Sequence, residues 1–274
     1  MSVEYKEHKA RSADNLGLVI HTWKGAAKPT HQLLIVHGYA EHAARYREYA
    51  HFLADNGVYV VAPDLRGHGL SEGQRGHVDD YAEYFLDVEE AKRLLLDDTP
   101  TLILGHSNGG LIVLDYLSTG DRGFNAAILS NPYLGLAIDV PAPKVWAGNV
   151  AGVVLPKLAM PSGLDAAGLS HDEEIVKRYR RDPYVFSTVT AGWFRESSKA
   201  QDRVKAMGSL PLPFLYMFSD SDPIASPADN RDLANALSGP AKKVVERRGE
   251  LHEILNEVDR LSLYQETLEW ITTH

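Results

Sequence analysis

Residues 101–110 read Thr-Leu-Ile-Leu-Gly-His-Ser-Asn-Gly-Gly and carry more information about the fold than any other stretch. The apolar run Leu102–Leu104 is typical of a buried strand, and Gly-x-Ser-x-Gly follows it with Ser107 at its centre. Helical spacing then begins, with apolar residues at Leu111, Ile112, Leu114 and Leu117. A serine between a strand and a helix, flanked by glycines that allow a tight turn, is the context of a nucleophile. The sequence therefore predicts that Ser107 is a nucleophile rather than part of a purely structural turn.

Composition excludes several classes of function. The chain has 274 residues, of which 44% are hydrophobic and 24% are charged, which suits one core with an insertion. Its net charge is −9, and no cluster of lysine and arginine alternates with aromatic residues, so we expect no nucleic-acid partner. There is no cysteine, which excludes disulfides, thiol nucleophiles and thiolate metal sites.

Neither the start nor the middle of the chain resembles a membrane segment. Residues Met1–Glu7 lack an apolar core, so the sequence predicts no secretory signal there. The apolar-rich run Val145–Pro156 carries no charge but is too short to span a bilayer. A cytoplasmic location is the resulting expectation.

The remaining apolar runs alternate with helical patterns. Two β-like runs, Val3–Lys9 and Leu18–Trp23, open the chain. Further strands are predicted at Leu33–Val36, Val58–Val61, Ala126–Leu129, Leu212–Phe218 and Lys243–Glu246. Helices are predicted around Arg45–Leu53, Asp80–Leu96, Asp229–Leu237 and Ile254–Ile271. Apolar strands separated by amphipathic helices indicate an α/β fold with a mostly parallel sheet covered by helices on both faces.

The segment 133–206 interrupts this alternation. Its first part, Leu134–Leu169, holds only four charged residues and several prolines, and a charged helix is predicted over His171–Arg181. We interpret 133–206 as a lid inserted into a core made of 1–132 and 207–274. The alternative interpretation is that the segment only adds more core.

A serine nucleophile needs a base, and the base needs an orienting acid. On a parallel α/β sheet the acid and the histidine follow the serine in that order, each just after a late strand. Asp222 follows the predicted strand Leu212–Phe218, and His252 follows Lys243–Glu246. Asp220 is the competing acid, but we expect it to be a turn residue that binds backbone amides.

Other histidines fit the role of the base less well. His252 is the histidine that follows a late strand in a short loop. His106 is expected to pack beside the nucleophile. His42 and His51 are expected to be exposed on or beside a helix, and His68 and His77 lie in a loop.

Acyl transfer also requires donors for the developing oxyanion. The backbone N–H of Asn108, next after the nucleophile, is one candidate. The backbone N–H of Tyr39, in the loop after Leu33–Val36, is the other, because Gly38 permits a tight path there. Since the backbone supplies both donors, the side chains of Tyr39 and Asn108 are expected to matter less than their positions suggest.

Four motifs in order carry a resemblance to a known family. They are residues 37–42 (His-Gly-Tyr-Ala-Glu-His, followed by Arg45-Tyr46), 64–71 (Asp-Leu-Arg-Gly-His-Gly-Leu-Ser), 105–110 and 252–257 (His-Glu-Ile-Leu-Asn-Glu). With them the chain resembles α/β-hydrolases of the monoacylglycerol lipase and lysophospholipase group over nearly its whole length. The resemblance implies an eight-stranded sheet, a mobile lid after the sixth strand and a triad of Ser107, Asp222 and His252. It also implies hydrolysis of one fatty-acyl ester of a monoglyceride-like or lysophospholipid-like lipid, without a metal or cofactor.

Two departures from the group concern the acyl pocket. Tyr39-Ala40 stands where the group usually has a small or aliphatic residue followed by glycine, and Asn108 stands where it usually has methionine. These two changes leave the acyl-chain length and the lipid class open.

Several alternatives remain at this point. The same triad serves an acyltransferase or a perhydrolase, and a short-chain carboxylesterase would share it. A non-catalytic binding protein with this fold is the third possibility. A lid of this apolar character is also able to contact a membrane surface transiently, although the negative net charge opposes attraction to anionic lipid. The sequence contains no signal for the oligomeric state.

Overall fold

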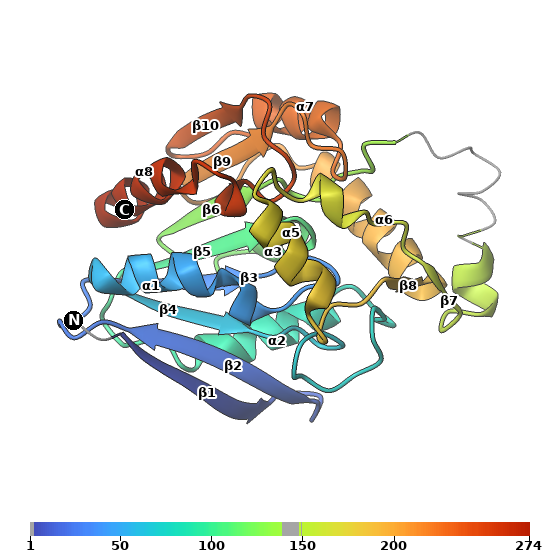
Figure 1. Cartoon of the computed structure of the whole chain (residues 1–274), viewed down its shortest axis with the longest axis horizontal. Helices are drawn as coiled ribbons and strands as arrows, with labels where there is room; N and C mark the ends of the chain where they lie inside the picture. The colour runs from blue at the N-terminus through green and yellow to red at the C-terminus, as the bar shows by residue number, and fades with distance from the viewer. Residues whose placement is uncertain (1–2, 139–147, 149) are drawn as a thin grey trace.

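The computed structural model describes residues 3–138, 148 and 150–274. Its centre is an eight-stranded sheet with the order β1-β2-β4-β3-β5-β6-β9-β10. β1 pairs antiparallel with β2, and β2 pairs antiparallel with β4. The remaining neighbours pair in parallel, which confirms the predicted α/β-hydrolase architecture (Figure 1).

The strands coincide with the predicted apolar runs, with shifts of a few residues at their ends. The sheet strands are β1 (Glu4–Arg11), β2 (Gly17–Lys24), β3 (His31–Val36), β4 (Val58–Pro63), β5 (Thr101–His106), β6 (Ala126–Ser130), β9 (Phe214–Ser219) and β10 (Lys242–Arg247).

Helices cover both faces of the sheet. The helices on the sheet are α1 (Arg47–Asp55), α2 (Glu83–Lys92), α3 (Asn108–Ser118), α7 (Pro227–Ala236) and α8 (Arg260–Thr273). Helix α6 (Ala191–Lys205) packs on α3, and α5 (Glu173–Arg181) packs on the 3-10 turn η2 (Ala166–Gly168). Two further 3-10 turns are η1 (Ala43–Tyr46) and η3 (Ile254–Asn256). Successive side chains of a strand point to opposite faces. In β3, Leu33 and Ile35 pack with residues of α1 and α8, whereas Leu34 and Val36 pack with residues of α2 and α3. Both faces are therefore apolar, which explains the uninterrupted hydrophobic runs.

Two predicted helices were too long. The expected helix Asp80–Leu96 is shortened to α2, and the expected C-terminal helix is divided into η3 and α8. The division falls at Glu257, whose backbone is extended. Its buried carboxylate accepts the backbone N–H groups of Leu251 at 2.7 Å and His171 at 3.1 Å, so this residue fixes a loop instead of continuing a helix.

Segment 133–206 contains η2, α5, α6 and a separate two-stranded sheet of β7 (Ala159–Pro161) and β8 (Thr188–Thr190). Helix α6 was not predicted, and its residues Trp193, Ala200 and Val204 belong to the main core. Part of the predicted lid, 139–147 and 149, lies outside the described residues, as does the matching part of the run Val145–Pro156. The lid boundaries stay a prediction.

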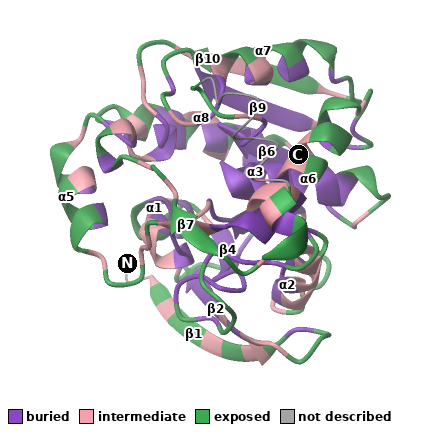
Figure 2. Cartoon of the chain, turned by 90° about the vertical axis from the view of Figure 1, so that its right-hand side faces the viewer, coloured by how far each residue is buried: buried purple, intermediate pink, exposed green. Residues whose placement is uncertain are grey.

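Burial follows this layering (Figure 2). The central strands are buried, whereas β1 and the outer surface of α5 face solvent. None of the helices in the described ranges combines the length and the apolar character that crossing a bilayer requires. Because β3, β5, β9 and β10 run in parallel, the loops after them emerge at one edge of the sheet. The candidate site residues follow these strands.

Candidate active site

Ser107 lies on the sharp turn between β5 and α3. Its backbone has φ 52° and ψ −120°, a left-handed conformation that is strained for a residue with a Cβ. The turn is possible because glycines stand two residues before and two residues after Ser107. A Cβ on Gly109 would lie 2.0 Å from the carbonyl oxygen of Val36 in β3. The conformation places Ser107 at the start of α3, where the partial positive charge of the helix is concentrated.

The structure brings Ser107, His252 and Asp222 together from three distant parts of the chain. His252 Nε2 lies 2.9 Å from Ser107 Oγ, and His252 Nδ1 lies 2.7 Å from Asp222 Oδ2. All three side chains are buried, and Ser107 keeps 7% of its surface exposed. The linear order hydroxyl, imidazole, carboxylate is the geometry that activates a serine.

Backbone contacts fix the acid and the base. The second oxygen of Asp222, Oδ1, accepts the N–H groups of Ile224 at 2.8 Å and Ala225 at 3.0 Å, which leaves Oδ2 for the histidine. Asn131, which follows β6 with φ 41°, donates from Nδ2 to the His252 carbonyl at 2.6 Å and accepts the Ser219 N–H at 2.8 Å. Asn131 thus ties the histidine loop to β9, a role the sequence analysis did not identify.

The charges around His252 favour its protonated form. Burial lowers the pKa of His252, but the Asp222 carboxylate, with Glu253 and Glu41 further away, outweighs burial and raises the pKa above its usual value of 6.5. The neighbouring His106 has no such partner, and burial lowers its pKa to about 4. His106 therefore stays neutral and packs beside the base, with a distance of 4.9 Å between ring centroids. Its predicted packing role agrees with this placement.

The two proposed oxyanion donors lie beside the nucleophile. Asn108 follows Ser107 directly, and Tyr39 lies in a loop so close that a Cβ on Gly38 would be 3.2 Å from Ser107 Cβ. Within the described ranges, neither backbone N–H, that of Tyr39 or that of Asn108, has a hydrogen-bond acceptor. Unpaired N–H groups beside a nucleophile are available to a negatively charged oxygen.

His37 sets the orientation of the Gly38–Tyr39 peptide. Its Nε2 accepts the Leu65 N–H at 3.0 Å, so its Nδ1 carries the proton and donates to the Gly38 carbonyl at 2.7 Å. Burial lowers the pKa of His37 to about 4, which keeps the ring neutral. In a trans peptide the N–H points opposite to the carbonyl, so the Tyr39 N–H points away from His37.

A buried ion cluster of Glu41, Arg45 and Glu253 links this loop to the base. Glu41 Oε1 accepts the Gly38 N–H at 2.6 Å, and Glu41 Oε2 accepts Arg45 Nη1 at 2.8 Å. Arg45 also binds both oxygens of Glu253, the residue after His252, at 2.6 and 2.8 Å. The motifs of the resemblance contained these three residues, but the sequence alone indicated no role for them, because the Arg45–Glu253 pair joins positions 208 apart.

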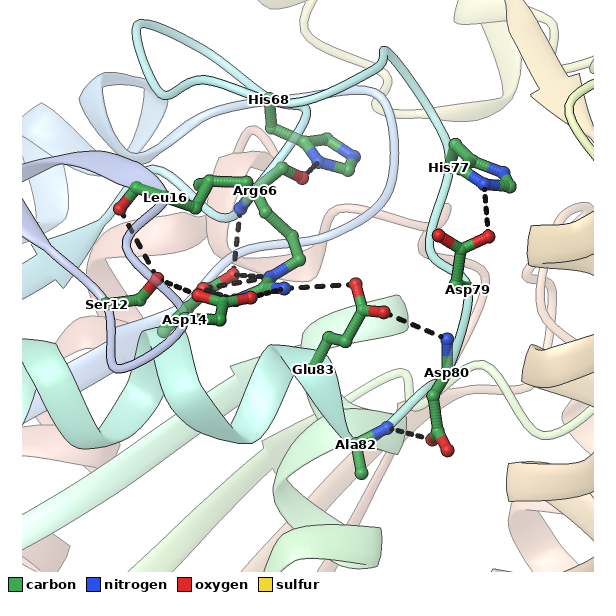
Figure 3. A network of polar contacts seen from close by, with 11 residues as sticks. Ser12, Asp14, Leu16, Arg66, His68, His77, Asp79, Asp80, Ala82 and Glu83 are labelled. Atoms are coloured by element: carbon green, nitrogen blue, oxygen red, sulfur yellow. Dashed lines mark hydrogen bonds and ion pairs between the residues drawn. The ribbon is translucent and has the colours of Figure 1, made fainter.

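Asp220 and the other candidate histidines form no hydrogen bond with the triad in the described part of the chain. Asp220 is exposed and accepts the Gly249 N–H at 2.8 Å, as expected for a turn residue. His42 was expected to be exposed but is buried, because Asp182 from segment 133–206 lies 2.9 Å from its Nε2. His51, also expected to be exposed, is half-buried. In the loop before α2, His68 Nδ1 lies 2.9 Å from the Arg66 carbonyl and His77 Nε2 lies 3.1 Å from Asp79 (Figure 3).

Trp193 of α6 packs against two aromatic residues whose backbones lie close to the nucleophile. Its ring centroid lies 4.0 Å from that of Tyr39 and 5.9 Å from that of Tyr133. The Tyr133 N–H in turn donates to the Ser107 carbonyl at 2.9 Å. Sequence analysis missed Trp193 because it missed the helix that carries it.

Comparison with known proteins gives consistent matches. A family model described as "Serine aminopeptidase, S33" matches residues 27–259. A protein of Mycolicibacterium smegmatis named monoacylglycerol lipase is 30% identical over 273 residues, covering 98% of this chain and 97% of that protein. The Bacillus subtilis phospholipase YtpA is 29% identical over 248 residues, covering 89% of this chain and 95% of that protein. The solved structure of a monoacylglycerol lipase from Paleococcus ferrophilus aligns over 100% of both chains with a TM-score of 0.84 and 26% identity.

Proposed function

The chain belongs to the α/β-hydrolase family described as serine aminopeptidase S33, and from this we propose that Ser107, His252 and Asp222 form the catalytic triad of a lipid-ester hydrolase. The enzyme is a carboxylic ester hydrolase acting on lipid esters, since its full-length relatives are a monoacylglycerol lipase and a phospholipase. The substrate we propose is a lipid with one fatty-acyl ester, of the monoglyceride or lysophospholipid type.

The observation that carries the proposal is the continuous contact from Asp222 through His252 to Ser107, at 2.7 and 2.9 Å. In the first half of the reaction, neutral His252 takes the Ser107 proton on Nε2 as Oγ attacks the ester carbonyl. Asp222 holds the Nδ1 proton and stabilises the imidazolium. The N–H groups of Tyr39 and Asn108 bind the oxyanion of the tetrahedral intermediate. When this intermediate breaks down, His252 transfers its proton to the leaving alcohol.

Deacylation uses the same groups in reverse. A water molecule replaces the alcohol, His252 removes one of its protons, and the resulting hydroxide attacks the acyl-enzyme carbonyl. The fatty acid leaves when Ser107 Oγ regains its proton from His252. The oxyanion donors act in both halves because each half passes through a tetrahedral intermediate.

For the segment that we interpret as a lid, we propose transient contact with a lipid surface. Helical residues 150–154 and the turn after them expose Val153, Val154, Leu155 and Leu158, with exposed fractions between 46% and 69%. Contiguous exposed apolar side chains are uncommon on a soluble surface and suit contact with an aggregated lipid substrate. The net charge of −9 means that apolar contact, rather than attraction to anionic headgroups, would supply the binding energy.

A hydrolysis panel tests the proposed function. Wild-type protein and Ser107→Ala should be assayed with mono-, di- and triglycerides and with lysophospholipids over a range of acyl lengths. We expect wild-type activity on the lipids with one acyl ester and none in Ser107→Ala. No release of fatty acid from any of these lipids, or equal release by the variant, would contradict the proposal.

A further inference from the structure

The backbone and the side chain of Tyr39 lie in two different parts of the structure. Its backbone lies beside Ser107 and supplies the proposed oxyanion N–H. Its side chain extends away from the nucleophile into segment 133–206, where its ring contacts Trp193 and lies 5.5 Å from the ring centroid of Phe186. A single residue therefore joins the candidate oxyanion hole to the segment above it.

Two backbone carbonyl groups bind the phenol oxygen of Tyr39. Tyr39 Oη donates to the Thr188 carbonyl of β8 at 2.8 Å, and the Gly76 carbonyl lies 3.2 Å away. Gly76 has φ 62°, and a Cβ built on it would lie 2.1 Å from Tyr39 Oη. A side chain at position 76 would thus occupy the place of the phenol.

The same backbone atoms are hydrogen-bonded to the residues that begin α6. Thr190 donates to the Gly76 carbonyl from its N–H at 3.3 Å and from its hydroxyl at 2.9 Å. The same hydroxyl accepts the Trp193 N–H at 3.2 Å and so caps the N-terminus of α6. The phenol, Gly76, β8 and the start of α6 are therefore held together by hydrogen bonds.

The position of the Tyr39 N–H depends on the contacts that hold Tyr39 and its neighbours in place. His37 holds the Gly38 carbonyl on one side, and Ala40 on the other side has φ 61°, which is unfavourable for alanine. A strained loop keeps its shape only when its surroundings hold it there. We propose that the phenol of Tyr39 is a positioning group that anchors the oxyanion loop to β8 and the start of α6. This inference rests on the proposed function, and it means that the Tyr39 side chain matters more than the sequence suggested.

Tyr39→Phe removes the phenol oxygen and keeps the ring. Complete loss of an oxyanion donor reduces kcat about 10²- to 10³-fold, so a donor that is merely displaced should reduce kcat about tenfold. We expect that decrease with KM changed less than about twofold, because the anchor acts on the transition state rather than on substrate binding. The matched control is Tyr49→Phe, since Tyr49 is buried and its phenol donates to Thr267 Oγ1 at 2.8 Å, a contact between α1 and α8, which carry none of the triad or oxyanion residues.

Gly76→Ala supplies a second, independent variant, because its methyl group displaces the phenol without changing residue 39. Concentrations of active enzyme are set by titration with a fluorophosphonate, so that unfolded protein does not contribute. If the anchor operates, Gly76→Ala lowers kcat in the wild type but adds little in Tyr39→Phe. Equal kcat values for Tyr39→Phe and Tyr49→Phe, or additive effects in the double variant, would overturn the inference while leaving wild-type hydrolysis as support for the function.

Discussion

At the scale of single residues, the protonation of His252 controls the proposed reaction. Only neutral imidazole can accept the Ser107 proton, so kcat/KM should increase with pH through the pKa of His252 in the free enzyme. Burial lowers the pKa of His252, but Asp222 and the nearby glutamates raise it above 6.5. We therefore expect an inflection above pH 6.5 in a kcat/KM profile measured with a soluble p-nitrophenyl ester.

Asp222→Asn provides the matching test. Without the carboxylate, burial dominates, and the inflection should move to lower pH while kcat falls by up to about 10⁴-fold. A profile that is flat from pH 5 to 9 in the wild type would exclude His252 as the base.

Glu253→Gln tests the ion cluster of Glu41, Arg45 and Glu253. Removing this buried charge takes away part of the field that raises the pKa of His252, so the inflection should move to lower pH. Arg45 also loses a charged partner, and the free energy of unfolding should fall by about 1–3 kcal/mol. The control is Glu246→Gln on β10, where the carboxylate pairs with Arg231 near the surface. If both variants keep the wild-type inflection, the cluster has only a structural role.

At the scale of elements, the turn between β5 and α3 depends on close packing of backbone against backbone. Gly109→Ala would place a methyl group 2.0 Å from the Val36 carbonyl oxygen, with no flexible side chain able to move aside. We expect loss of several kcal/mol in the free energy of unfolding, measured by denaturant titration, and loss of esterase activity.

Gly208→Ala is the matched control for this change. A Cβ at Gly208 meets no atom within 4 Å, so stability and activity should remain close to wild type. Wild-type behaviour of Gly109→Ala would show that α3 can move away from β3, contrary to the packing described.

The elements that sequence predicted well are those defined by local pattern. Leu102–Leu104, Gly-x-Ser-x-Gly and the apolar spacing after it require only neighbouring residues, and β5 and α3 lie where they were expected. The positions of Asp222 and His252 followed from chain order on a parallel sheet. Helix α6 was not predicted, because its buried residues, such as Trp193 and Ala200, are separated by serine, lysine and glutamate in a segment whose sequence otherwise indicates irregular structure.

The parts that sequence could not predict depend on contacts between distant positions. The C-terminal helix starts late because Glu257 binds the backbone of Leu251 and His171, and His42 is buried because Asp182 covers it. The Arg45–Glu253 pair is likewise invisible to a local pattern. The motifs contained both residues, but not the contact between them.

At the scale of the whole molecule, Arg66, in the loop after β4, connects the β1–β2 turn to α2. Its guanidinium lies 2.8 Å from Asp14 in the β1–β2 turn and 3.0 Å from Glu83 of α2 (Figure 3). It also lies 2.8 Å from Asp87 of α2. Arg66 is 3% exposed and Asp87 is fully buried. Removing one member of a buried pair leaves the other charge without compensation.

Arg66→Ala should therefore lower the free energy of unfolding by about 3–5 kcal/mol, measured by denaturant titration. Arg66→Ala with Asp87→Ala should recover part of that loss, because no buried carboxylate remains unpaired. Arg93→Ala removes a side chain that is 72% exposed in its pair with Glu90 and should change stability by less than about 1 kcal/mol. An Arg66→Ala protein as stable as Arg93→Ala would show that the core does not depend on this network.

The convergence of the three loops on Ser107 is tested most directly by trapping the covalent intermediate. Wild-type protein is mixed with a p-nitrophenyl fatty-acyl ester, quenched in acid during the burst and digested, and the peptides are examined by mass spectrometry. We expect the acyl mass on the peptide containing Ser107, with no acylated peptide and no turnover in Ser107→Ala. An acyl group on another residue, or turnover that survives in Ser107→Ala, would contradict the assignment of the nucleophile.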